Sequence, residues 1–149
     1  MAHAQQQILD ALQAVLIAGD TLAGARVFVD RVDPLQKQDL PAILIGEDAD
    51  GESVETEDLD GTEYRTLHVM INCVLVDSEG AAAQGRAFGL AVEKLVSPCP
   101  ALLAFSATGP RMTSSRMLQN GEGDRLFGGR QQAWLIDYCV HPSAPDVIL

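Results

Sequence analysis

The sequence predicts an α+β domain in which two helices pack against one mainly antiparallel sheet of about five strands. Three patterns favour this class: a helical apolar period near the start, a strand alternation over residues 64–76, and two further strand patterns near the end. The chain has 149 residues, the common size of one domain, and shows no dividing linker. We therefore expect a single domain over residues 1–149.

The first part of the chain is expected to form one helix followed by two strands. One helix face would carry Ile8, Leu9, Leu12, Val15 and Leu16. Gly19 then supplies a C-terminal stop. A short β-branched and aromatic run predicts a strand over residues 25–32, and a second strand follows over residues 40–45.

Residues 47–63 are dominated by carboxylates and contain no Lys or Arg. The nine carboxylates are Glu47, Asp48, Asp50, Glu52, Glu55, Glu57, Asp58, Asp60 and Glu63. Packing this segment would desolvate like charges together, so we expect a long, solvated acidic loop. The segment supplies most of the formal net charge of -11, which repels phosphate and disfavours non-specific nucleic-acid binding.

Residues 64–76 are the longest strand candidate. The face directed to the core would carry Leu67, Val69, Ile71, Cys73 and Leu75. The opposite face is half polar, with Thr66, His68, Met70 and Asn72. This face is either solvated or meets a partner, which makes His68 and Met70 candidate partner contacts.

The rest of the chain predicts a helix and a closing hairpin. A helical stripe over residues 78–96 carries Ala81, Gln84, Phe88, Val92, Leu95 and Val96. Residues 101–110 are expected to be irregular. Strands over residues 111–119 and 131–141 would form a long C-terminal hairpin, with Trp134, Ile136, Tyr138 and Val140 on one face of the second strand.

The glycine-rich tip of this hairpin contains Arg125, Leu126, Phe127 and Arg130. Apolar side chains between arginines resemble interface anchors, so we expect these four residues to contact another subunit or a partner. The tip is not a phosphate-binding loop, because it lacks Gly-Lys-Ser/Thr and is not placed between a strand and a helix.

One part of the acidic segment partly matches a calcium-binding loop. Asp48, Asp50, Gly51 and Glu57 correspond to positions three, five, six and twelve of such a loop. Position one is Gly46, and the predicted flanks are strands rather than helices. We therefore expect no bound cofactor, with at most a weak divalent-cation effect on assembly.

The histidines and cysteines form no recognised catalytic or metal motif. The histidines have no HExxH spacing, and the cysteines have no CxxC spacing. Buried or free thiols in a reducing compartment are the expected state of the cysteines. A nucleophile–base pair between Cys73 or Cys139 and His68 or His141 stays open as an alternative, because strands distant in sequence can be neighbours.

Over nearly its whole length, the chain resembles the tail terminator (minor tail protein U-like) family of long-tailed bacteriophages and prophages. The resemblance rests on the opening helix, Val27-Phe28-Val29 with Arg31 and Pro34, Leu40-Pro41-Ala42-Ile43, the acidic segment, the long strand over residues 65–77, the second helix, and a closing hairpin with Trp134, Tyr138 and Val140. It implies a non-catalytic subunit of a hexameric ring. That ring caps the tail tube, ends its polymerisation and presents a surface to the head–neck complex.

The resemblance implies three partners: other copies of the chain, the tail tube protein and the head–neck proteins. DNA would pass through the ring without specific binding, and the protein would lie in the virion tail after assembly in the host cytoplasm. We expect no secretory signal and no membrane segment, because the N-terminus lacks a basic region and the apolar runs are short. The alternatives are another phage neck or tail-completion protein, a small cytosolic enzyme or ligand-binding domain with a Cys/His pocket, and a metal-dependent regulator.

Overall fold

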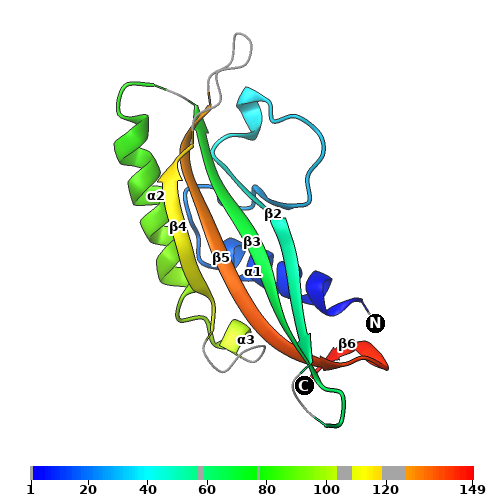
Figure 1. Cartoon of the computed structure of the whole chain (residues 1–149). Helices are drawn as coiled ribbons and strands as arrows, with labels where there is room; N and C mark the ends of the chain where they lie inside the picture. Colours follow the sequence, from blue (N-terminus) through cyan, green and yellow to red (C-terminus); the bar gives the residue numbers. More distant parts are fainter. Residues whose placement is uncertain (1, 57–58, 77, 104–108, 119–126) are drawn as a thin grey trace.

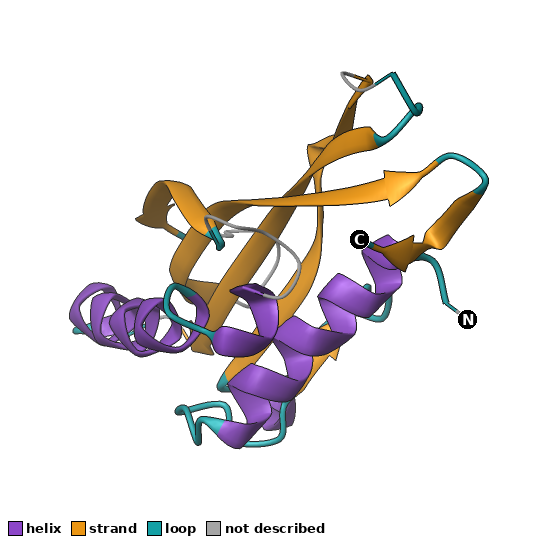
Figure 2. Ribbon diagram, turned by 90° about the horizontal axis from the view of Figure 1, so that it is seen from below, coloured by secondary structure: helices purple, strands orange, loops and turns teal. Residues whose placement is uncertain are grey.

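The computed structural model describes residues 2–56, 59–76, 78–103, 109–118 and 127–149. Within these residues, six strands form one curled, mixed sheet, and three α-helices lie on one of its faces (Figures 1 and 2). The strand order is β1-β2-β3-β5-β4, and β6 pairs with β5 outside this path. The predicted α+β class is confirmed. No described helix has the length and apolar character needed to cross a bilayer.

Helix α1 (Ala4–Ala18) forms as the apolar period predicts. It buries Ala4, Ile8, Leu9, Leu12 and Leu16 against the sheet, and Gly19 is its C-cap. Strand β1 (Val27–Val29) is shorter than the predicted 25–32 and pairs in parallel with residues 43–45 of β2. A short 3-10 helix, η1 (Lys37–Asp39), lies in the connection to β2.

The acidic segment corrects one expectation. Strands β2 (Ala42–Thr56) and β3 (Glu63–Val76) form a long antiparallel hairpin, so residues 47–56 are a strand and not a solvated loop. These like charges can lie on one strand because most of the side chains of residues 47–56 remain exposed to water. Glu47, Asp50 and Glu55 remain exposed, whereas Glu52 is half-buried beside partners. Glu57 and Asp58 lie outside the described residues.

Strand β3 is central and pairs with β2 on one side and with β5 (Phe127–His141) on the other. The pairing with β5 runs from Glu63 opposite Val140 to Val76 opposite Phe127. The core face of β3 is buried as predicted, with Leu67, Val69, Ile71, Cys73 and Leu75. On β5, Trp134, Ile136, Tyr138 and Val140 are also buried.

Helix α2 (Ala81–Val96) approaches β5 closely through small residues. The predicted stripe is wrong at Gln84, which is exposed, and the buried stripe contains Gly85 and Gly89. A Cβ atom added at Gly85 would lie 2.9 Å from the backbone of Gly129. The buried Gln132 side chain joins the two elements, because it donates to the Gly89 carbonyl oxygen at 3.0 Å and accepts from Trp134 Nε1 at 3.1 Å.

The C-terminal half contains elements that the sequence patterns missed. Residues 100–103 form the short helix α3 (Pro100–Leu103) rather than an irregular segment, because Leu102 is buried in the core. Strand β4 (Arg111–Met117) pairs with β5 as expected, and the unpredicted β6 (Ala144–Ile148) pairs with the end of β5.

The expected position of the hairpin tip is also corrected. Strand β5 begins at Phe127, so Phe127 and Arg130 belong to a strand that pairs with β3 and not to a tip. Pairing with a long neighbour extends β5 through Gly128 and Gly129, which local propensity alone would assign to a turn. Arg125 and Leu126 lie outside the described residues.

We predict that Gly129→Ala is strongly destabilising. Gly129 has φ +131°, and an added Cβ would lie 1.9 Å from the Cys73 carbonyl oxygen, so the β3–β5 pairing must shift. We expect a loss of unfolding free energy above about 3 kcal/mol, combining backbone strain with steric overlap. Urea denaturation measures the loss.

Gly51→Ala is the matched control for Gly129→Ala. Gly51 also has positive φ, at +61°, but no atom lies within 4 Å of its added Cβ. The control should lose only about 1–2 kcal/mol. Equal losses in the two variants would contradict the close approach at Gly129.

Candidate functional site

The sheet face opposite the helices is uncovered by any described helix (Figure 1). The strand registers place Met70 between Gly46 and Ala133, and His68 opposite Leu135. These side chains are half-buried by their neighbours within the sheet but are not covered by a second layer. We call the face formed by Leu44, His68, Met70, Ala133 and Leu135 the open face. His68 and Met70 therefore lie where the alternation predicts.

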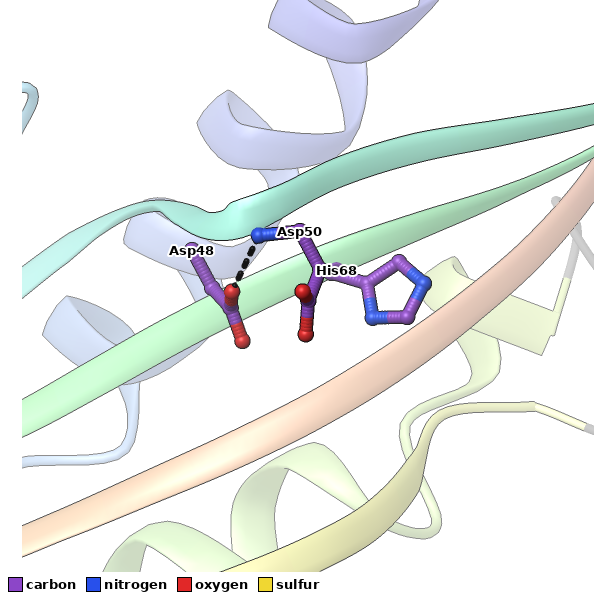
Figure 3. Close-up of side chains that lie close together, drawn as sticks. All are labelled: Asp48, Asp50 and His68. Atoms are coloured by element: carbon purple, nitrogen blue, oxygen red, sulfur yellow. Dashed lines mark hydrogen bonds between the residues drawn. The ribbon is translucent and has the colours of Figure 1, made fainter.

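Asp48, Asp50 and His68 come together beside the open face (Figure 3). One potential ligand atom from each residue lies within 4.8 Å of the others, and Asp50 N donates to Asp48 Oδ1 at 2.7 Å. The two aspartates are brought to His68 by the register shift between Glu47 and Glu52 of β2. Two carboxylates and an imidazole are suitable donors for a divalent metal ion, in a grouping unlike the all-oxygen calcium loop considered from the sequence.

Glu52 connects the acidic half of β2 to three other elements on the helix-covered side. Its Oε1 accepts a hydrogen bond from the Tyr138 hydroxyl of β5, and its Oε2 accepts from Gln5 Nε2 of α1 at 2.7 Å. Arg65 Nη1 of β3 lies 3.5 Å from the same Oε2, and Arg65 Nη2 pairs with Glu63 at 2.6 Å. Burial, together with the hydrogen bond to Glu52, raises the pKa of Tyr138, which keeps its hydroxyl a donor at neutral pH.

Basic side chains gather around the hollows between α2, which packs on β5, and the edge strand β4. Two adjoining hollows of about 680 and 250 Å³ share Leu90 and Glu93 in their lining. We call them together the α2–β4 groove; its basic lining residues are Arg86, Lys94, Arg111 and Arg130. Arg130 is held in place here, since its Nε donates to Ser115 Oγ at 2.8 Å.

Sequence reasoning missed most of this groove. The sequence patterns place Arg130 at a glycine-rich tip, and they mark no residue of α2 or β4 as a partner contact. A usable signal was nevertheless present in the charge pattern, because most of the ten Lys and Arg residues lie between positions 86 and 130. They are Arg86, Lys94, Arg111, Arg116, Arg125 and Arg130.

The described geometry does not favour a pairing of Cys73 with His68. The two side chains lie on opposite faces of β3, because their positions differ by an odd number. Burial raises the pKa of the Cys73 thiol to about 12, so it stays protonated at neutral pH. His141 has other contacts: its Nδ1 lies 2.6 Å from Ser143 Oγ and its Nε2 lies 3.0 Å from the Asp60 carbonyl oxygen.

A scan against models of known protein families and a search of curated proteins find no match to this chain. The features that bear on function are therefore the open face, the carboxylates of the β2–β3 hairpin and the α2–β4 groove, together with the sequence resemblance described above.

We predict that Glu52→Ala destabilises the protein by about 1–3 kcal/mol, because Tyr138 and Gln5 lose their shared acceptor. Glu55→Ala is the matched control: Glu55 lies on the same strand but is exposed, so we expect a change within about 0.5 kcal/mol. Urea denaturation compares the two variants. Equal stabilities would show that the Glu52 contacts do not support the hairpin.

Stability should also fall at alkaline pH through Cys73. The thiol pKa rises from 9.0 in the unfolded reference to about 12 in the folded protein, so the folded state retains a proton that the unfolded state loses. This contribution is complete below about pH 9 and is lost as pH rises towards about 12. Between about pH 8 and pH 10.5, the loss should be about 2 kcal/mol, at about 1.4 kcal/mol per pH unit above 9.

The variant Cys73→Ala isolates this effect, because it removes the thiol and leaves the other alkaline groups in place. Urea denaturation of each protein at both pH values gives the comparison. The wild type should lose more stability than the variant over this interval. The same loss in both proteins would contradict the assignment.

Proposed function

We propose that this chain is a structural subunit of a phage tail: a tail terminator that assembles into a hexameric ring on the tail tube and ends tube polymerisation. The proposal starts from the sequence resemblance. The structural observation that carries it is the open face. A two-layer subunit whose helices cover one side of the sheet leaves the other side available for a protein contact.

The composition of the open face supports a protein partner. Leu44, Met70 and Leu135 are half-buried side chains in neighbouring strands, and the polar His68 lies among them. An apolar centre with polar neighbours is the usual composition of a protein interface. In this proposal, the open face contacts the tail tube protein or a head–neck protein.

The charge of the chain supports a ring through which DNA passes without specific binding. The formal net charge of -11 repels phosphate at every copy around the ring. Each attractive phosphate contact would instead add affinity and retard passage. The proposed location is the virion tail, after assembly in the host cytoplasm.

The proposal includes no catalytic step and no resident cofactor. A divalent cation can still modulate assembly through Asp48, Asp50 and His68, because it would reduce repulsion between carboxylates on the β2–β3 hairpin. This effect would be weak, since Asp50 is exposed to water and Asp48 and His68 are half-buried.

Size-exclusion chromatography with light scattering and negative-stain microscopy tests the proposal. A ring of six copies has a mass of about 95 kDa, six times the 15.9 kDa of one chain, and shows a central channel. We expect this species, and we expect it to bind the ends of isolated tail tubes. A monomer throughout the accessible concentration range, or a closed dimer, would contradict the proposed function.

A further inference from the structure

The β2–β3 hairpin and the turn at its tip carry four exposed carboxylates among the described residues. Glu47, Asp50 and Glu55 of β2 are exposed and form no ion pair with any described residue. Asp60, which precedes β3, is also exposed, and hydrogen bonds from Thr62 lower its pKa, which keeps it charged. We call this part of the chain the acidic hairpin. It offers negative charge that the subunit itself does not neutralise.

The α2–β4 groove offers the opposite charge. Arg86 and Lys94 are exposed on α2 and form no ion pair with any described residue. Arg111 lies at the same groove and pairs at the surface with Asp137 at 2.8 Å. Because the subunit is strongly acidic as a whole, this concentration of basic side chains is a local exception.

The two charged surfaces cannot meet within one subunit. Figure 1 shows the hairpin of β2 and β3 leaving the lower end of the sheet, whereas α2 and β4 follow its left side. Strand β5 separates β3 from the edge strand β4. Complementary charges on separate surfaces of a subunit favour contact between copies.

Apolar side chains accompany both charged surfaces. The acidic hairpin exposes Leu59 completely and Val54 by 51%, and the groove exposes Leu90 by 50% and Met112 by 38%. An apolar centre within a charged rim is the arrangement of interfaces whose binding energy comes from a few central residues.

We propose that the acidic hairpin of one copy docks in the α2–β4 groove of the next copy. Val54 and Leu59 contact Leu90 and Met112, and carboxylates of the hairpin face Arg86 and Lys94 at the rim. The two patches differ, so the contact is heterologous and closes a ring or propagates as a filament. The inference deepens the proposed ring function, because it identifies the surfaces that join neighbouring subunits.

Charge reversal of each surface gives a direct test. The hairpin variant carries Glu55→Lys and Asp60→Lys, and the groove variant carries Arg86→Glu and Lys94→Glu. Each variant alone brings like charges together at every contact, so self-association should weaken about tenfold or more. An equimolar mixture restores opposite charges at every contact in an alternating ring, so assembly should return.

A third variant, Asp10→Lys with Asp33→Lys, is the matched control. It changes the net charge by the same amount as the hairpin variant, but at two exposed residues outside both surfaces. This control should assemble at least as well as the wild type. All measurements are made at about 0.15 M salt, where the screening length is about 8 Å and only neighbouring charges interact. Thermal melts confirm that each variant is folded.

The outcomes separate this contact from the proposed function. If the wild type forms rings and both charge-reversal variants still form them, the proposed contact is overturned and the proposed ring function stands. Filaments or open chains that follow the same loss and rescue would support the contact and overturn the ring. A wild type that never self-associates would overturn both, and failure of the mixture to restore assembly would overturn the proposed pairing of surfaces.

Discussion

The carboxylate of Glu52 is the constraint on which the shape of this protein depends. It lies at the point where the acidic half of β2 leaves the helix-covered part of the sheet, and it joins that half to α1, β3 and β5. A carboxylate in this half-buried position is stabilising only with strong donors, and Tyr138, Gln5 and Arg65 supply them. Glu55, which follows it on β2, is therefore held on a strand.

The placement of both long helices on one side of the sheet determines which surfaces remain available. Helix α2 approaches β5 closely because Gly85 and Gly89 have no side chains there, and Gln132 satisfies the polar backbone that this contact buries. Because both long helices lie on the other side of the sheet, no described helix covers the open face. The edge strand β4 and the outer side of α2 then define the basic groove.

Charge would have two opposing effects on the proposed assembly. The net charge of -11 makes copies repel one another at long range, whereas the separation of the acidic hairpin from the α2–β4 groove favours one relative orientation at short range. Salt screens the long-range effect first, because only charges within about 8 Å still interact at about 0.15 M salt. In the proposed assembly, selective association therefore requires contact between the two complementary surfaces, and the apolar side chains there would supply much of the affinity.

The sequence by itself determined the α+β class, the buried face of α1 and the alternation along β3 and β5. These features depend on local periods: apolar side chains recur about every 3.6 residues on the buried side of a helix and every 2 residues on the buried side of a strand. His68 and Met70 were placed on the open face for the same reason.

Tertiary structure decided the features that depend on pairing between distant segments. Residues 47–56 became a strand because β3 and the Glu52 partners supplied contacts that no local pattern contains. Arg130 was drawn into β5 by pairing with β3, and Asp48 and Asp50 met His68 only through the register of the β2–β3 hairpin. The basic groove likewise exists only because α2 packs on β5, next to the edge strand β4. This brings basic residues that are far apart in the sequence to one surface.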